Sequence, residues 1–528
     1  MGPKPIFPLG PGAAYPAAIL SGLLYWLAFP GVNVWPLALV TFVPLLLALR
    51  EQTPKRGLAL GLVSGLTMNL AGFYWLTNML RTFSGFPTAL CVLFVVIICT
   101  YQGGRIALMG WLYARATQRG WPHAVVALGA FAASELIYPL LFPWFFGATV
   151  HNAHALSQVA EIGGPVLVGI VLLGVSLAVE ELIHARLLKR APDRKLVLAG
   201  FGGLAASALF GYVRILQVDA RAQASEALHV GIVQGNMGLI EKREMAAEGL
   251  NRHKRMTHEL AAMGVDLVVW SESSVSMGVT EDMYKPFYKA NVSKSLGVPT
   301  IFGVVIVRDD PDPRKEKYFN SALISDAKGD VKGRYDKEYL LYFGETLPFG
   351  ETFPILHEWS PNSGRFSSGT ELDPLPFETK TGTHNASVLI CYEDVLPAFT
   401  NKMVSHAHPD LLVNITNDAW FGNTSEPWEH LALATFRSIE HRRYLVRSTN
   451  SGISAFVDPV GRVMVHSEPF QAQRIDAIVH LMHESTVYEL VGDWPAWILS
   501  GVIIVFAYRK RRKPGQTDQT RETEAKQT

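Results

Sequence analysis

The chain has 528 residues, of which 49 % are hydrophobic and 18 % are charged. This length suits two domains, and the composition argues against a wholly soluble protein and for one that lies partly in a membrane. The formal net charge of +1 offers no global attraction for nucleic acid, so no nucleic-acid partner is expected.

The first 217 residues consist largely of apolar segments of bilayer-spanning length. Seven predicted spans lie there, and an eighth follows a long polar region. Their ranges are 12–30, 36–50, 57–79, 88–114, 122–146, 163–184, 195–217 and 490–508. No small-residue cleavage site follows the first range, which argues against a signal peptide. We therefore predict a membrane domain at 1–217, a polar domain at 218–489, a last span at 490–508 and a tail at 509–528.

Lysine and arginine are concentrated in alternate loops, after the second, fourth and sixth predicted spans. The tail after the last span opens with Arg509-Lys510-Arg511-Arg512-Lys513, and Arg81 is the exception in the other set of loops. Because basic loops stay in the cytoplasm, both termini are predicted to be cytoplasmic. The polar domain is then predicted to lie on the outer side of the membrane.

The polar domain alternates between strand-like and helix-like patterns, which predicts an α/β layered fold. The predicted strands are 228–236, 265–272, 299–307, 319–326, 386–392, 409–417 and 451–457. The predicted helices are 239–263, 281–296, 395–407 and 427–444.

Glu272, Lys337 and Cys391 each stand close to the end of a strand-like run. Side chains at strand ends converge at one rim of an α/β sheet, so we expect these three to lie together. A carboxylate can accept the proton of a thiol, and an ammonium group can stabilise first the thiolate and then an oxyanion. The pattern predicts acyl transfer through a thioester. Cys91 and Cys99 share one apolar segment and are predicted to be packing residues, so no disulfide framework is expected.

Other charged residues have a more ordinary interpretation. Arg105 lies within the fourth predicted span, and Glu135 lies at matching depth in the fifth, so we predict that they pair. His430 and His441 are expected to be structural or surface residues on a helix. A further group on that helix is predicted to be a solvated face that could also meet lipid phosphates: Arg437, Arg442 and Arg443.

The order of glutamate, lysine and cysteine resembles that of the nitrilase superfamily. From about residue 12 to 508, the whole chain resembles the apolipoprotein N-acyltransferase family of the bacterial inner membrane. The matching stretches are Phe142-Pro143-Trp144, Val233-Gln234-Gly235-Asn236, Tyr335-Asp336-Lys337, Phe343-Gly344-Glu345, Cys391-Tyr392-Glu393, Asn417-Asp418-Ala419-Trp420-Phe421-Gly422, Arg447-Ser448-Thr449-Asn450-Ser451-Gly452-Ile453-Ser454 and Gly492-Asp493-Trp494-Pro495.

The resemblance implies an αββα sandwich of the nitrilase type on the periplasmic face, joined to a polytopic domain of eight helical spans. It implies a ping-pong reaction in which Cys391 takes the sn-1 acyl chain of a phospholipid, expected to be phosphatidylethanolamine. The chain then passes to the α-amine of a diacylglyceryl cysteine on an apolipoprotein. Glu272 would be the general base, and Lys337 would stabilise the oxyanion.

The same resemblance assigns supporting roles. The backbone N–H of Tyr392 would be a second oxyanion donor, and Glu345 and Glu393 would support the site. Further residues are expected to line the substrate path: Trp420, Phe421, Tyr342 and Phe343. No metal or organic cofactor is implied, and the family leads us to expect a monomer.

The chain departs from the family pattern at 237–241, at Ser271 and at 341–342, which leaves its lipid preference open. Other functions stay possible on the residues alone. A membrane-tethered amidase or hydrolase would use water as the acceptor, although a tether needs only one span. An inactive scaffold would not need Glu272, Lys337 and Cys391, and a transporter would need a polar pathway that the spans lack.

Overall fold

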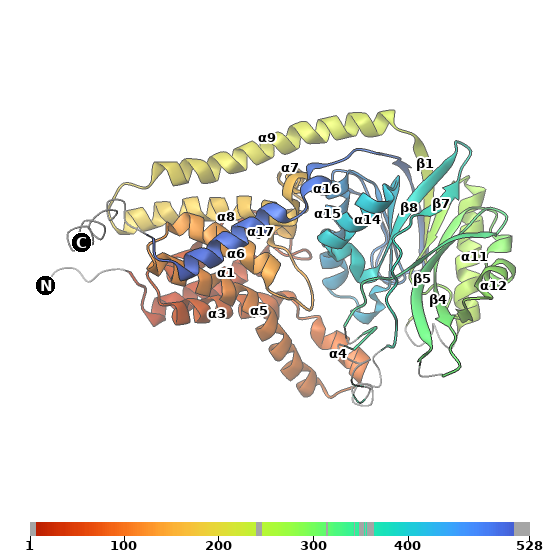
Figure 1. The fold of residues 1–528 in the computed structure, drawn as a ribbon, viewed down its shortest axis with the longest axis horizontal. Helices are drawn as coiled ribbons and strands as arrows, with labels where there is room; N and C mark the ends of the chain where they lie inside the picture. Colours follow the sequence, from red (N-terminus) through yellow and green to blue (C-terminus); the bar gives the residue numbers. More distant parts are fainter. Residues whose placement is uncertain are drawn as a thin grey trace, which may run out of the picture.

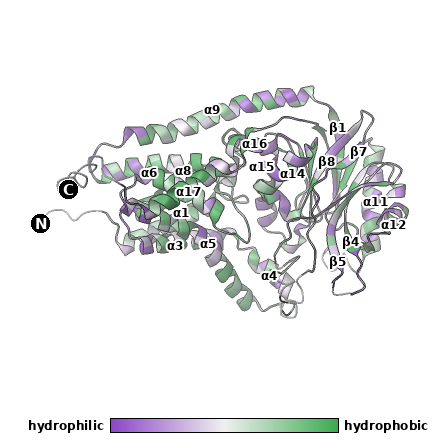
Figure 2. Cartoon of the chain, in the orientation of Figure 1, coloured by the Kyte–Doolittle hydropathy of each residue, from purple (hydrophilic) through white to green (hydrophobic). Residues whose placement is uncertain are grey.

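The structure is a computed structural model, and it describes residues 7–238, 245–312, 315–342, 344–347, 353, 355 and 364–511. A helical domain lies at one end of the molecule and a two-sheet sandwich at the other (Figure 1). The last helix of the chain returns from the sandwich to pack among the first helices. Apolar residues dominate the helical end, which Figure 2 shows in green.

The helical domain is built from long apolar segments with short breaks. Its elements are α1 (Pro11–Leu27), η1 (Trp35–Leu39), α2 (Val43–Leu49), α3 (Pro54–Gly72), α4 (Leu76–Ser84), α5 (Thr88–Gln118), α6 (His123–Ile137), η2 (Phe146–Val150), α7 (His154–Ser157), α8 (Ala160–Leu187), α9 (Arg194–Ala224), α16 (Val487–Val491) and α17 (Trp494–Tyr508). Every range predicted to span a membrane contains a helix.

Three helices in the described part of the chain are long and apolar enough to cross a bilayer: α5, α8 and α9. The pair formed by α3 and the start of α4 would be a fourth if it is one span, although it bends by 60°. The helices α6 and α17 are apolar but shorter. These helices indicate a membrane protein, and the layout of eight spans stays a prediction.

Small residues allow α3 and α5 to approach closely. A Cβ atom added at Gly57, Gly61 or Gly65 of α3 would overlap backbone atoms of α5. Contact of this kind is the usual means by which helices pack in lipid, where no hydrophobic force draws them together. The predicted pair of Arg105 and Glu135 is confirmed, because Nη1 and Oε1 lie 3.1 Å apart and both side chains are buried.

The sandwich has two mixed sheets. The first has the order β13-β1-β2-β4-β5-β6, with β3 beside β4, and the second has the order β12-β11-β10-β9-β8-β7. The strands of the first are β1 (Ala227–Gln234), β2 (Leu267–Trp270), β3 (Gly278–Thr280), β4 (Thr300–Arg308), β5 (Lys317–Ser325), β6 (Val331–Asp336) and β13 (Gln473–His480). Those of the second are β7 (Leu375–Glu378), β8 (Thr383–Ile390), β9 (Leu411–Thr416), β10 (Leu445–Thr449), β11 (Ala455–Val457) and β12 (Val463–His466).

Helices cover the outer face of each sheet. The helices α11 (Ala246–Ala262) and α12 (Tyr284–Asn291) cover the first, and α14 (Pro397–Ala407) and α15 (Glu426–His441) cover the second (Figure 1). Residues of β2 alternate between two cores, since Leu267 and Val269 pack between the sheets while Val268 and Trp270 pack under α11 and α12. This is the predicted αββα arrangement.

The predicted strands at 228–236, 265–272, 299–307, 319–326, 386–392 and 409–417 coincide with β1, β2, β4, β5, β8 and β9. The range 451–457 contains β11, and β6 is the strand-like run expected before Lys337. The strands β3, β7, β10, β12 and β13 were not predicted. The predicted helix 239–263 falls partly outside the described residues, and the other three helices are found.

The prediction of a solvated face for Arg437, Arg442 and Arg443 is wrong, because all three side chains are buried. The end of α15 packs against the helical domain, where Arg442 Nε donates to Glu161 Oε2 of α8 at 2.5 Å. Arg437 Nη2 donates to Glu440 Oε1 at 2.5 Å, within the same helix. Arg437 and Arg442 are thus ion-paired inside the molecule, and Arg443 donates to the carbonyl oxygens of Pro409 and Glu484. A sequence pattern alone does not distinguish such buried cations from an exposed basic face.

Candidate active site

Cys391 follows the carboxyl end of β8 and begins the short helix η5 (Cys391–Val395). Its φ of 51° lies in the left-handed region, which a residue with a Cβ adopts only when its surroundings enforce it. The Asn414 side chain on the neighbouring β9 donates from Nδ2 to the carbonyl oxygen of Cys391 at 3.3 Å. The turn therefore presents the half-buried thiol at the rim of the sheet.

The opposite sheet supplies Glu272 and Lys337. Glu272 is the second residue after β2, and Lys337 directly follows β6. Both side chains are buried. Lys337 Nζ donates to Glu345 Oε2 at 2.6 Å.

One amide connects the two carboxylates of this group. Asn320 of β5 donates from Nδ2 to Glu272 Oε1 at 2.7 Å and to Glu345 Oε1 at 2.9 Å. Glu345 also accepts from the backbone N–H of Leu341 at 2.9 Å. A chain of hydrogen bonds thus runs from Glu272 through Asn320 and Glu345 to Lys337.

These groups act electrostatically on Cys391. Burial raises the pKa of the Cys391 thiol, the charge of Glu272 raises it further, and the ammonium of Lys337 lowers it. Burial lowers the pKa of Lys337, but the charges of Glu345, Cys391 and Glu272 outweigh it and leave that pKa raised. The thiol is therefore neutral in the resting site, and the Lys337 ammonium group stays charged.

Glu393 holds the loop between β6 and Glu345 in place through hydrogen bonds. Its Oε1 accepts from the Tyr335 hydroxyl at 2.8 Å and from the backbone N–H groups of Glu338 and Tyr339 at 2.8 and 3.0 Å. Its Oε2 accepts from Ile390 N at 2.7 Å. Burial raises the pKa of Glu393 to about 7, against the lowering effect of Lys337 and of these bonds. Glu393 thereby fixes Lys337 relative to the turn of Cys391.

A buried ionic network lies beneath the nucleophile. Arg447 of β10 donates from Nη1 to Asp394 Oδ2 and to Asn414 Oδ1, each at 2.7 Å. Its Nη2 lies 3.2 Å from Asp418 Oδ2, and His430 Nε2 lies 2.8 Å from Asp394 Oδ1. Burial lowers the pKa of His430, but the neighbouring carboxylates outweigh it and raise that pKa to about 10.

Among the described residues, one group could hold a metal ion by its geometry: Asp418, Glu426 and His430 offer atoms within 4.8 Å of one another. Arg447 and a protonated His430 already supply positive charge to this cluster. We interpret the group as part of the ionic network.

Aromatic residues stand between the site and the helical domain. The Tyr392 hydroxyl donates to the carbonyl oxygen of Leu141 at 3.3 Å. Phe421 meets the Trp75 ring edge-on, with centroids 5.2 Å apart. Trp420 and Tyr342 are exposed, which suits residues on a substrate path. The other residue predicted to line it, Phe343, lies outside the described residues.

Sequence reasoning missed Asn320, Asn414 and the role of Arg447. A single asparagine in a strand gives little signal, although Asn414 is flanked by buried Val413 and Ile415, and Asn320 by buried Phe319 and Ser321. Arg447 was noted only as part of a matching stretch.

The chain matches two family models, and the matches agree with the fold. Residues 229–481 match the carbon-nitrogen hydrolase family, which together with the sandwich defines a domain of the nitrilase class. Residues 21–178 match the apolipoprotein N-acyltransferase N-terminal domain.

Relatives named apolipoprotein N-acyltransferase align along almost the whole chain. One from Geobacter metallireducens is 30 % identical, over 96 % of this chain and 98 % of its own. One from Pseudomonas putida is 27 % identical, over 93 % of this chain and 95 % of its own. An amidase of the nitrilase superfamily from Nesterenkonia AN1 covers 51 % of this chain and 96 % of its own at 14 % identity, with a TM-score of 0.35. The chain belongs to the apolipoprotein N-acyltransferase family.

Proposed function

We propose that this enzyme, an N-acyltransferase that acylates lipoproteins, works through a thioester on Cys391. The observation that carries the mechanism is the hydrogen-bonded chain of Glu272, Asn320, Glu345 and Lys337. It orders a carboxylate and an ammonium group whose charges both act on the thiol. These are the base and the oxyanion stabiliser that thiol acyl transfer requires.

In the first half-reaction, Glu272 accepts the thiol proton as the sulfur attacks an ester carbonyl of a phospholipid. Because the pKa of the Cys391 thiol is raised, proton transfer accompanies attack instead of preceding it. The Lys337 ammonium group and the backbone N–H of Tyr392 donate hydrogen bonds to the oxyanion and stabilise its negative charge. The carbon–oxygen bond then breaks, and Glu272 returns the proton to the leaving lysophospholipid.

In the second half-reaction, the α-amine of a diacylglyceryl cysteine attacks the thioester. Glu272 accepts a proton from the amine, the carbon–sulfur bond breaks, and the proton returns to the sulfur. An amide replaces a thioester, so the transfer runs downhill. Water must stay away from the thioester meanwhile. The aromatic residues next to the site, Tyr392, Trp420, Phe421 and Tyr342, would serve that purpose.

We further propose that the sandwich, residues 218–489, lies on the periplasmic face of the bacterial inner membrane, with both termini in the cytoplasm. The basic residues of alternate loops support this orientation. The ester donor would be phosphatidylethanolamine, which a lipid titration would test. Cysteine labelling from outside intact spheroplasts, at an engineered site on the sandwich surface, would test the orientation.

The mechanism is tested by intact-protein mass spectrometry of the purified full-length protein in detergent. After exposure to phosphatidylethanolamine alone, we expect a mass gain of one acyl chain that hydroxylamine removes. The Cys391→Ala variant should show no such gain, and addition of a diacylated lipopeptide should discharge the wild-type adduct. An adduct in Cys391→Ala would contradict the mechanism. Lipid consumed without an adduct would instead support a hydrolase that uses water.

A further inference from the structure

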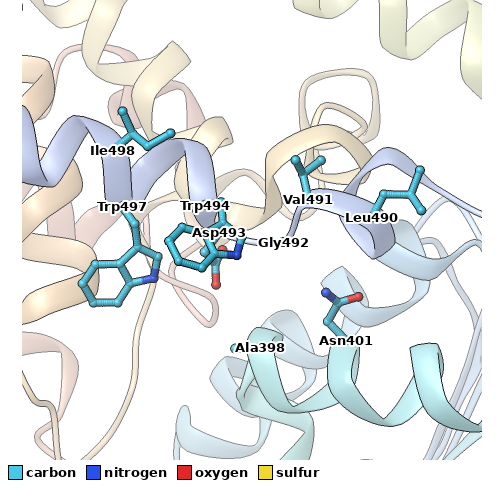
Figure 3. A pocket seen from close by; sticks show the side chains of 9 residues that line it. All are labelled: Ala398, Asn401, Leu490, Val491, Gly492, Asp493, Trp494, Trp497 and Ile498. Atoms are coloured by element: carbon cyan, nitrogen blue, oxygen red, sulfur yellow. The ribbon is translucent and has the colours of Figure 1, made fainter.

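The sandwich and the helical domain meet in two contrasting ways. Where α16 leads into α17, a cavity of about 700 Å³ lies between α14 and the start of α17 (Figure 3). Beside the nucleophile the two domains are bonded instead, because the Tyr392 hydroxyl donates to the carbonyl oxygen of Leu141 at 3.3 Å. The way in which the helical domain holds Leu141 therefore bears on the reaction centre.

Leu141 lies in residues 138–145, which connect α6 to η2 without helical structure. Backbone groups in such a segment lack the partners that a helix supplies, and within a membrane there is no water to replace them. Neighbouring helices supply partners at its end. Arg105 of α5 donates from Nη1 to the carbonyl oxygen of Trp144, and Glu135 Oε2 of α6 accepts from Phe146 N at 3.2 Å. The end of the segment is thus bonded to both α5 and α6.

Gln102 of α5 holds the middle of the segment. Its side chain is buried, and its Oε1 accepts from Leu141 N at 2.9 Å and from Phe142 N at 3.4 Å. Its Nε2 donates to the carbonyl oxygen of Phe142 at 2.9 Å. Only this orientation of the amide satisfies all three backbone groups. Leu141 is therefore bonded on both sides, because its N–H donates to Gln102 and its carbonyl oxygen accepts from Tyr392.

Tyr392 connects this segment to the reacting atoms. The peptide group between Cys391 and Tyr392 contains the backbone N–H that the proposed mechanism assigns to the oxyanion. The carbonyl oxygen of the same peptide group accepts from Asn414 Nδ2 at 3.3 Å. Because a peptide group is planar, its orientation sets the direction of the N–H. Asn414 restrains this unit from the sandwich, and the bond from the Tyr392 hydroxyl to Leu141 restrains it from the helical domain.

We propose that Gln102 is a positioning residue for acyl transfer. Through Leu141 and Tyr392 it keeps the backbone N–H of Tyr392 directed at the place where the oxyanion forms. A donor that is aimed in advance stabilises the transition state without reorganisation, and a misplacement of about 1 Å can cost about a hundredfold in rate. The inference rests on the proposed thioester mechanism and adds to it a residue of the apolar helix α5.

The test is the rate of adduct formation by the full-length protein in detergent, measured by rapid-quench mass spectrometry at a series of phosphatidylethanolamine concentrations. Gln102→Leu keeps the approximate size of the side chain and removes its donor and its acceptor. We expect the maximal rate to fall about tenfold, which is the effect of one hydrogen bond of typical net strength. The lipid concentration that gives half of the maximal rate should stay the same, because lipid binding is not affected.

Gln52→Leu is the matched control. Gln52 is also a buried glutamine of the helical domain, and its Nε2 donates to the carbonyl oxygen of Leu9 at 3.1 Å. It lies between α2 and α3 and has no bond to residues 138–145 among the described residues. We expect the maximal rate of Gln52→Leu to equal that of the wild type. An equal loss of rate in Gln52→Leu and Gln102→Leu would overturn the proposal.

A double-mutant cycle separates positioning from a general loss of structure. Tyr392→Phe removes only the hydroxyl and breaks the same series of hydrogen bonds at its other end, so it should also lower the maximal rate about tenfold. The double variant should be no slower than the slower single variant. Losses that multiply to about a hundredfold would overturn the proposal, because the two residues would then act independently.

Two further outcomes are decisive. If Gln102→Leu folds poorly, Tyr392→Phe alone still tests the proposal, since a wild-type rate in that variant would show that the bond to Leu141 does not orient the reaction centre. A normal adduct in the wild type together with an unchanged rate in Gln102→Leu would overturn this inference and leave the thioester mechanism standing. Absence of an adduct in the wild type would contradict the mechanism itself, and this inference with it.

Discussion

The two sheets of the sandwich hold their functional residues in different ways. The first sheet orders Glu272 and Lys337 through the neutral amide of Asn320 and a single ion pair with Glu345. The second supports Cys391 on a buried network of full charges centred on Arg447. The difference follows from the backbone. Glu272 and Lys337 come at ordinary strand ends, whereas Cys391 has a left-handed conformation that costs about 1–3 kcal/mol and must be enforced.

The polar residues of the first sheet should therefore matter more for the rate of the reaction than for the stability of the fold. We expect Lys337→Met and Glu272→Gln each to slow formation of the acyl adduct by about 10²–10⁴-fold, the usual range for a lost acid–base or oxyanion group. Rapid-quench mass spectrometry of the adduct would measure this. Lys332→Met is the matched control, because Lys332 lies on β6 as well but is solvent-exposed. A loss smaller than about tenfold in Lys337→Met would remove Lys337 from the mechanism.

The second sheet should contribute stability first. Arg447→Met leaves Asp394 and Asp418 buried without their cation, so we expect a loss of about 3–5 kcal/mol in the free energy of unfolding. Denaturant unfolding in detergent would measure it. Arg474→Met is the control, because Arg474 pairs with Glu259 at a half-exposed position and should cost about 0.2–1 kcal/mol. Similar losses in the two variants would mean that the network under Cys391 is no more important than a surface pair.

A smaller effect on stability is expected at Glu429, where α15 contacts the helical domain. Glu429 accepts from the Trp75 indole at 3.2 Å and from the Ser425 hydroxyl at 2.7 Å, and burial raises its pKa to about 8. The folded protein thus binds this proton more tightly than the unfolded chain does. Its contribution to stability is full below the unfolded pKa, near 4.5, and is lost as the pH rises through about 8.

Glu429→Gln keeps both hydrogen-bond partners and removes the titration. We expect its Tm to fall less than that of the wild type between pH 6 and pH 9, by roughly 2–4 °C. Glu248→Gln, at an exposed position on α11, should follow the wild type. If the difference in Tm between the wild type and Glu429→Gln stayed the same across this pH range, Glu429 would not be the group that titrates.

The sequence allowed the buried parallel strands β2 and β8 to be predicted, with Glu272 and Cys391 just after their carboxyl ends, because apolar runs identify such strands. Lys337 was expected at the same rim, although it follows β6, a more polar strand that runs antiparallel to β5. The sequence did not reveal β10, since Arg447, Ser448 and Thr449 are polar and yet fully buried. Nor did it reveal Asn320, whose function depends on which two carboxylates it reaches. The burial of Arg442 was missed because its partner, Glu161, lies 281 residues away in the chain.

The bond from the Tyr392 hydroxyl to Leu141 has a consequence for how this enzyme could be divided. Tyr392 is next to the nucleophile, whereas Leu141 lies in the loop after α6, so one edge of the reaction centre is supplied by the helical half. A fragment cut to residues 218–489 for work in water would retain Glu272, Lys337 and Cys391 and yet lack this edge. Both domains are needed for a complete reaction centre. A chimaera of two family members would therefore have to exchange the contacting surfaces of the sandwich and of the helical domain together.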